Sequence, residues 1–490
     1  MATKRNVLLI TADQWSGDYL GCAGNKEILT PSLDELARYG IRYSNAVSTT
    51  PVCIPARREL MLGCTSKKHG DRIFNETLPM PQDIPSLAQT FRDNGYQAYA
   101  VGKLHVFPQR DRIGFDDVIL YEEGRHKKGM SQDDYERFLA HNGHAGEEFS
   151  HSMCNNNYSF RPFNMDEKFH PTNWITREMC ETIIRRDPNK PTFWYLSYAA
   201  PHPPLVPPKD YLDLYDDVEF EFPAFGEWTK KPKSELPFGY TYYSSLYEYY
   251  TSSRRLAANA KKAYYASCTY IDHQLRLVIG TLREQGLLED TIILFTADHG
   301  EMLGTHGSFG KFLMYEPCVK IPMILSAPAS CGMPCNKVDD RIVELRDVMP
   351  TLLTLAGVPV PETVDGRSLT ESWDRDYTYG ELWEDDRATR MIRTKEWKLI
   401  YYPVGNIFQL FHIEEDPKEL VDLAGEPKFK DVQEALTRIL ISRLYGGDER
   451  FVKDGKLVGL PQKKYNFYAT LQDPDKLFKG RDMLLQRGLR

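Results

Sequence analysis

The sequence predicts an α/β protein with a large, mostly parallel sheet sandwiched by helices, and a smaller C-terminal domain built on an antiparallel sheet and a helix. Apolar strands alternate with helical stretches in the first part of the chain, which is typical of parallel sheets. Short strands with brief connections follow from about residue 375. Because 490 residues exceed what one small core organises, we expect one domain over residues 1–375 and an α+β domain over 376–490, which ends in a candidate extended tail.

The first sixty residues establish this alternation. The run Val7–Thr11 is continuously apolar up to its last residue, as expected for a central strand that is covered on both faces. Thr30 and Pro31 suit the N-cap and the first position of a helix, and Gly40 suits its end. The chain then becomes extended again at Ile41–Tyr43.

The alternation continues downstream, where the residue patterns predict helix Pro85–Asn94, strand Ala98–Val101, strand Phe193–Tyr198, helix Ala257–Gln285 and strand Thr291–Thr296. Four polar residues each come just after a predicted strand: Asp13, His202, Asp298 and His299. The carboxyl ends of parallel strands line the ligand crevice in this class of fold. We therefore expect these four side chains to lie near one another.

The last part of the chain predicts strands Tyr377–Leu382, Thr389–Arg393, Trp397–Tyr402 and Ile407–His412, and a helix over Val432–Tyr445. No regular period is evident over residues 120–190 and 207–250. The second of these segments contains a tyrosine-dense stretch at 240–250. It either lines a sugar-binding surface or packs on the body of the protein as an amphipathic segment.

Composition excludes several classes of protein. A net charge of −8 offers no basic face for nucleic acid, and no apolar run is long enough to span a membrane. The run Val7–Ile10 is too short for the apolar core of a signal peptide. Nine cysteines without regular spacing indicate mostly reduced thiols. We therefore expect a cytoplasmic protein, unless a leader has been removed.

The string TPVCIPARRELMLG at residues 50–63 carries the strongest chemical signal. Pro55 suits the first turn of a helix that continues through Leu62, so Cys53 lies beside the N-terminus of that helix. Free backbone N–H groups and the helix dipole favour anions at such a place. Arg57, one turn further on, can point back to the same anion.

This string resembles the modification motif of the type I sulfatases, members of the alkaline-phosphatase-like superfamily. The resemblance implies that Cys53 is oxidised to formylglycine by a maturation enzyme, and that the hydrated aldehyde attacks the sulfur of a sulfate ester. It also makes residues 1–375 the catalytic domain. Arg57 matches the arginine that binds the modified side chain.

The resemblance further implies one divalent metal ion bound by Asp13, Gln14, Cys53 in its modified form, Asp298 and His299. An oxygen-rich set favours Ca²⁺, with Mg²⁺ as an alternative, and a histidine ligand moves the preference toward Mn²⁺. Gln14 and His299 depart from the commonest family pattern. They resemble the forms found in choline sulfatases and phosphonate monoester hydrolases. Asp298 or another bound carboxylate would help deprotonate the nucleophile.

Four more residues match catalytic positions of the family. Lys103 and His105, in the segment GKLH, correspond to a lysine that holds the sulfate and a histidine that triggers release of the bound sulfate. His202, in PHPP, corresponds to the histidine that protonates the leaving oxygen. Lys311 corresponds to a second sulfate-binding lysine.

The resemblance therefore implies a sulfatase, with a small sulfated carbohydrate as the expected substrate. Choline sulfate is an alternative, for which Trp15 or the tyrosine stretch could supply an aromatic cage. A phosphonate or phosphate ester hydrolase using the same site is another alternative, which the Lys103–His105 pair disfavours. A silent sulfoglycan-binding protein is a third, if Cys53 stays unmodified. Whether the chain forms a homo-oligomer is left open.

Overall fold

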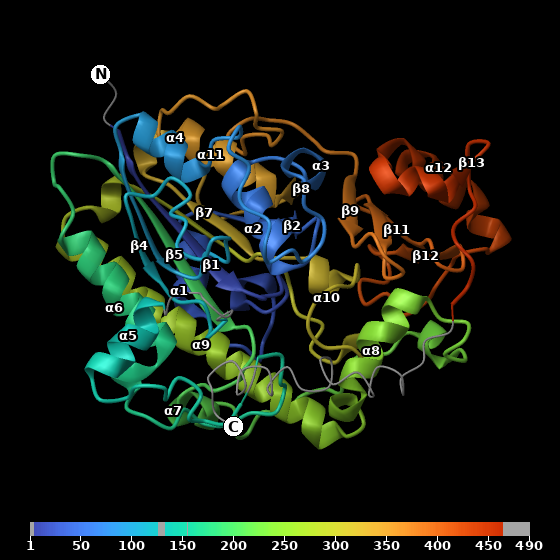
Figure 1. Ribbon diagram of the computed structural model, residues 1–490, viewed down its shortest axis with the longest axis horizontal. Helices are drawn as coiled ribbons and strands as arrows, with labels where there is room; N and C mark the ends of the chain where they lie inside the picture. The colour runs from blue at the N-terminus through green and yellow to red at the C-terminus, as the bar shows by residue number, and fades with distance from the viewer. Residues whose placement is uncertain (1–3, 126–132, 154, 464–490) are drawn as a thin grey trace.

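The structure is a computed structural model that describes residues 4–125, 133–153 and 155–463. Its largest element is an eight-stranded sheet (Figure 1). Its strands are β1 (Asn6–Asp13), β2 (Ile41–Val47), β3 (Gln97–Gly102), β4 (Asp117–Leu120), β5 (Thr192–Pro201), β6 (Thr291–Thr296), β7 (Met323–Ser326) and β8 (Lys337–Glu344). Their order is β4-β3-β5-β1-β6-β7-β2-β8, and only β7 runs antiparallel to its neighbours. The predicted mostly parallel sheet is confirmed.

Helices cover both faces of this sheet. The α-helices that precede the second sheet are α1 (Pro31–Arg38), α2 (Cys53–Leu62), α3 (Ser66–His69), α4 (Leu87–Asp93), α5 (Asp134–His141), α6 (Pro171–Ile184), α7 (Lys209–Asp213), α8 (Phe238–Thr251), α9 (Arg254–Glu284), α10 (Glu316–Val319) and α11 (Val348–Leu355). Helices α1, α6 and α9 lie on one face, and α2, α4 and α11 lie on the other (Figure 1). The central strand β1 is buried from Val7 onward, which explains its apolar run.

A second sheet follows, with strands β9 (Thr378–Leu382), β10 (Thr389–Arg393), β11 (Trp397–Tyr402) and β12 (Ile407–His412). All its strands are antiparallel, and α12 (Lys430–Arg443) packs on β10 and β11. Arg72, from the loop after α3, joins this region to the large sheet through buried ion pairs with Glu381 and Asp448. The predicted sheet and helix are confirmed. The domain boundary at residue 375 stays a prediction, and much of the expected tail lies outside the described residues.

Four α-helices of the described chain, α5, α6, α7 and α8, lie in or largely in the segments in which the sequence shows no period. Helix α6 hides its pattern because Thr172 and Thr176 lie on its buried face, where the Thr176 hydroxyl hydrogen-bonds the Thr172 carbonyl and the Tyr198 hydroxyl. Helix α8 contains the tyrosine stretch and buries Tyr240 and Tyr243. An aromatic residue with a polar tip suits both packed and exposed positions, so it gives little periodic signal. The other two helices, α5 and α7, are short.

The described part of the chain contains no helix with the length and apolar character that a membrane crossing needs.

The N-terminus of α1 is capped by a residue that is distant in sequence. Thr30 occupies the expected N-cap position, but its hydroxyl accepts from the Gly21 N–H and does not cap the helix. Instead, the Asp272 carboxylate on α9 accepts the backbone N–H groups of Ser32 and Leu33 at 3.0 and 2.8 Å. This contact fixes α1 to α9 and satisfies two helix N–H groups that would otherwise be buried without acceptors.

We predict that Asp272→Ala lowers the free energy of unfolding by about 1–2 kcal/mol, because both N–H groups of α1 lose their acceptor. Urea denaturation of the variant and of the natural sequence measures this difference. Asp217→Ala serves as a control, since Asp217 is exposed, and we expect its effect to stay within about 0.5 kcal/mol. Equal stabilities of the two variants would contradict the capping role.

Candidate active site

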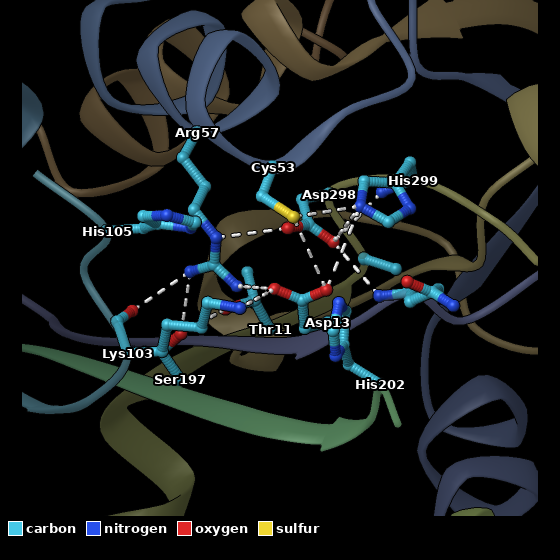
Figure 2. Close-up of polar contacts among 12 residues, drawn as sticks. Thr11, Asp13, Cys53, Arg57, Lys103, His105, Ser197, His202, Asp298 and His299 are labelled. Atoms are coloured by element: carbon cyan, nitrogen blue, oxygen red, sulfur yellow. Dashed lines mark hydrogen bonds and ion pairs between the residues drawn. The ribbon is translucent and has the colours of Figure 1, made fainter. Parts of the chain in front are cut away.

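The candidate site lies where four strands of the large sheet end (Figure 2). Asp13 is the last residue of β1, and Lys103 and His202 directly follow β3 and β5. Asp298 and His299 come two and three residues after β6. These strands are neighbours in the sheet and run parallel, so their carboxyl ends place the five side chains at one edge.

Cys53 projects into this edge from the first position of α2. Its Sγ lies 3.1 Å from Lys311 Nζ, 3.3 Å from His299 Nε2 and 3.8 Å from Asp13 Oδ1. The N-cap residue, Val52, supplies no side-chain cap. The helix N-terminus therefore keeps backbone N–H groups available near Cys53, where they favour negative charge.

The electrostatic surroundings of Cys53 favour an anion. Complete burial and the Asp13 carboxylate act to raise the pKa of the Cys53 thiol. The positive charges of Lys311 and Lys103 and the His299 imidazole outweigh them, so the pKa is lowered overall. A group that replaces the thiol at this position would meet the same positive potential.

Arg57 ties the strand ends to α2. Its guanidinium forms buried ion pairs with Asp13 and Asp298, both at 3.0 Å. It also donates to the Lys103 carbonyl at 2.9 Å and to the Ser197 hydroxyl at 2.9 Å. Four strands are thus connected through one side chain. Burial acts to lower the pKa of the Arg57 guanidinium, but Asp298 and Asp13 raise it overall, so Arg57 stays charged.

Four buried groups form a candidate metal site: ligand atoms of Asp13, Cys53, Asp298 and His299 lie within 4.8 Å of one another. His299 Nδ1 lies 3.0 Å from the Gly300 carbonyl, which can only accept, so Nδ1 carries a proton and Nε2 of the neutral ring presents a lone pair. That lone pair faces carboxylate oxygens of Asp13 and Asp298 at 3.7 and 3.8 Å. Such a concentration of lone pairs suits a divalent cation, and two carboxylates with one imidazole are compatible with Ca²⁺, Mg²⁺ or Mn²⁺.

Gln14 lies beside this group, and its backbone has a positive φ of 68°. Its backbone N–H donates to Asp298 Oδ1 at 3.0 Å. Its side-chain oxygen accepts from Lys311 Nζ at 2.9 Å, and its amide nitrogen donates to Tyr158 and Glu301. The amide thus orients Lys311 in this structure, and its role as a metal ligand stays a prediction.

Lys103 and His202 are joined by a carboxylate that sequence reasoning did not find. Lys103 Nζ lies 2.7 Å from Asp13 Oδ2 and 2.6 Å from Glu123 Oε2. The other oxygen of Glu123 lies 3.3 Å from His202 Nδ1. Lys103 therefore contacts Asp13 directly, and its positive charge acts on Cys53 electrostatically.

His105 flanks the site on the other side, next to Arg57 (Figure 2). Its backbone N–H donates to Glu122 at 2.8 Å, and its ring packs edge-on against Phe74. Within the described residues its Nδ1 has no hydrogen-bond partner. The structure thus brings the predicted residues to one edge, with Cys53, Asp13, Asp298, His299 and Lys311 in direct contact and His105 and His202 at its flanks.

Three site residues were missed in the sequence. Glu123 and Tyr158 lie in the segment without a period, and both act through contacts with residues that are distant in sequence. Glu301 follows Gly300 in the segment that leads to Lys311. Its closeness in sequence to the predicted metal ligands Asp298 and His299 was the feature that could have indicated a role in the site. Its carboxylate accepts from Leu303, Gly310, Tyr158 and Gln14, and so fixes the loop that ends at Lys311.

Comparison with known proteins agrees with this geometry. Residues 5–358 match the family described as Sulfatase. The chain belongs to the sulfatase family. As predicted from the sequence, it is therefore a sulfuric ester hydrolase. Residues 304–444 of the sulfatase also match the family described as N-sulphoglucosamine sulphohydrolase, C-terminal. An arylsulfatase of Clostridium perfringens (strain 13 / Type A) is 35% identical over 476 residues, which cover 93% of this chain and 97% of that protein.

Solved structures show the same fold. The phosphonate monoester hydrolase of Agrobacterium radiobacter superimposes with a TM-score of 0.76 at 22% identity and covers 90% of the sulfatase chain and 95% of its own. A protein bound to its substrate D-glucosamine-2-N,6-O-disulfate has a TM-score of 0.71 at 21% identity, with coverage of 90% and 97%. The predicted fold class is confirmed by these likenesses.

We predict that Glu301→Gln lowers turnover of 4-nitrophenyl sulfate by about 10- to 100-fold. Each oxygen of Glu301 accepts hydrogen bonds from two donors, and a glutamine would place an NH₂ group, itself a donor, against one of these pairs. If the Gln14 amide rotated to compensate, its own NH₂ group would face the Lys311 ammonium. Glu289→Gln, at an exposed position, should keep normal turnover. Unchanged turnover in Glu301→Gln would show that Lys311 does not depend on this carboxylate.

Proposed function

We propose that the sulfatase hydrolyses the sulfate ester of a small carbohydrate, using a formylglycine made from Cys53 and one divalent metal ion. A separate maturation enzyme would carry out the modification. The observation that supports this most strongly is the position of Cys53 at the N-terminus of a buried helix, in contact with Lys311, His299 and Asp13. An inert cysteine in an apolar core has no need of such charged neighbours.

Asp13, Asp298 and His299, together with residue 53 after its modification, would hold the metal, and Gln14 completes the predicted set. When bound, a divalent cation would neutralise a sulfate oxygen and favour the deprotonated form of the nucleophile. Ca²⁺ is the expected ion because carboxylate oxygens dominate the set, with Mg²⁺ and Mn²⁺ as alternatives.

The remaining residues have roles that follow from their positions. Lys311 and Lys103 supply positive charge on either side of residue 53, and Arg57 holds Asp13 and Asp298 in place. Fixed charges that need no rearrangement are usually the largest contribution to catalysis. His202 is proposed to protonate the leaving oxygen, and the unpartnered ring nitrogen of His105 to accept a proton when sulfate is released.

The structure bears on the alternative of choline sulfate. Trp15, one candidate for an aromatic cage, is completely buried against Phe295 and donates its N–H to the Tyr19 carbonyl. In the tyrosine stretch, Tyr240 and Tyr243 are buried within α8 packing. Trp15 therefore presents no open aromatic face. Tyr249 of the same stretch is 65% exposed, so the stretch keeps aromatic surface open and choline sulfate stays an alternative substrate.

We expect peptide mass spectrometry of protein from the native host to show formylglycine at position 53. Conversion of the thiol to the aldehyde gives a mass loss in the peptide that contains Cys53, and Cys53→Ala should abolish turnover of sulfate esters. Cys64, which is also buried, provides the control and should remain a thiol. An unmodified Cys53 in fully active protein would refute the proposed nucleophile.

Substrate class is tested by comparing turnover of sulfated mono- and disaccharides, 4-nitrophenyl sulfate, choline sulfate and a phenyl phosphonate monoester. We expect the highest kcat/KM on a sulfated sugar and the lowest on the phosphonate, because Lys103 and His105 match a sulfatase. Dialysis against EDTA should abolish all activities together, and added Ca²⁺ should restore them. Preferred turnover of the phosphonate would favour the alternative hydrolase.

A further inference from the structure

Glu123 is a buried carboxylate at the site to which the proposed mechanism gives no role. It follows β4 by three residues, is 2% exposed, and has a positive φ of 55°. It accepts from Lys103 at 2.6 Å and from Arg125 at 3.0 Å, and lies 3.3 Å from His202 Nδ1. These partners lower its pKa to about 2 in spite of burial, so Glu123 carries a full negative charge at neutral pH.

His202 is held with one ring nitrogen toward this carboxylate. Its Nδ1 lies 2.6 Å from the Pro203 carbonyl, which can only accept, so Nδ1 carries a proton in both charge states of the ring. Its Nε2 is buried and has no hydrogen-bond partner within the described residues. The ring stands beside Asp13 at the edge of the site (Figure 2). Nε2 is therefore the atom available to exchange a proton with a substrate.

To protonate a leaving oxygen, His202 must carry a proton on Nε2 as well as on Nδ1. Burial, and then the positive charge of Lys311, lower the pKa of His202 well below its usual value, and Lys103 acts in the same direction. Glu123 and Asp13 are the groups that oppose this shift. Asp13 is already paired with Arg57 and Lys103, which leaves Glu123 as the carboxylate in contact with the imidazole.

We infer that Glu123 is a positioning residue for His202, which orients the ring through Nδ1 and stabilises the imidazolium that protonates the leaving oxygen. This inference rests on the proposed role of His202. In the step, a hydroxyl of hydrated residue 53 gives up its proton to the solvent and its oxygen forms a bond to sulfur. The bond between sulfur and the ester oxygen breaks, its electron pair stays on the ester oxygen, and this oxygen takes the proton from Nε2. His202 becomes neutral and regains a proton from water before the next turnover.

A purely structural role for Glu123 would give a different result. If the carboxylate only fixed Lys103 and Arg125, its loss would affect binding of every sulfate ester equally. If it acts through His202, its loss matters most when the leaving oxygen needs a proton. A phenolate leaves less readily than 4-nitrophenolate, so phenyl sulfate and 4-nitrophenyl sulfate separate the two roles while presenting nearly the same shape.

The experiment measures kcat/KM of Glu123→Gln on both esters. We expect a loss of about 100-fold on phenyl sulfate, within the range for general acid catalysis, and a loss at least about tenfold smaller on 4-nitrophenyl sulfate. The ratio is independent of the fraction of active protein. Glu122→Gln is the matched control, since Glu122 accepts from the backbone of Leu104 and His105, and it should leave the ratio unchanged.

His202→Asn distinguishes the possible failures. It should show the same selective loss, and Glu123→Gln should add no further selectivity in its background. Absence of selectivity in His202→Asn would overturn the proposed role of His202. Selectivity in His202→Asn but equal losses on both esters in Glu123→Gln would overturn the inference about Glu123. If Glu123→Gln does not fold, Glu123→Asp, which keeps the charge further from the ring, should show a smaller selective loss.

Discussion

The site depends on one buried guanidinium. Arg57 reaches from α2 across the ends of the central strands and neutralises Asp13 and Asp298, two carboxylates that face the same small volume. Without it, Asp298 would lose its nearest positive partner, and Asp13 would depend on Lys103 at 2.7 Å, in a region closed to water. Because the same side chain donates to the Lys103 carbonyl and the Ser197 hydroxyl, the position of α2, which carries Cys53, is tied to the ends of the sheet strands.

Around this centre, charged and polar side chains contact one another in two series. On one side, Asp13, Lys103, Glu123 and His202 follow one another. On the other side, Cys53, Lys311, Gln14 and Glu301 do so. Lys103 is held by the Glu123 carboxylate and Lys311 by the Gln14 amide, so hydrogen-bonded partners fix the positive charges near residue 53.

Much of this could be predicted from the sequence. Strands β1 and β6 are apolar runs, and Asp13 and Asp298 lie at or just after their carboxyl ends. Residues at this position line the ligand crevice of a parallel sheet, so their place in the site could be expected. The cysteine motif revealed α2 and Arg57. Glu123 and Tyr158 could not be predicted, because their roles arise from tertiary contacts and the segment around them has no periodic pattern. Gln14 illustrates a further limit: its position was predicted, but its amide contacts depend on Glu301.

The strand order also determines how much of the chain must be translated before Cys53 can be buried. Strand β2 is separated from β1 by β6 and β7 and pairs only with β7 and β8. Helix α2 packs on the 3₁₀ turn Leu345–Asp347 and on α11. Cys53 therefore cannot be enclosed until about 290 more residues have been translated, which takes roughly 15 to 60 s at a rate of about 5–20 residues per second. During that interval Cys53 lacks the contacts that bury it in the complete fold, so an enzyme that acted on this side chain would have to reach it before the fold closes.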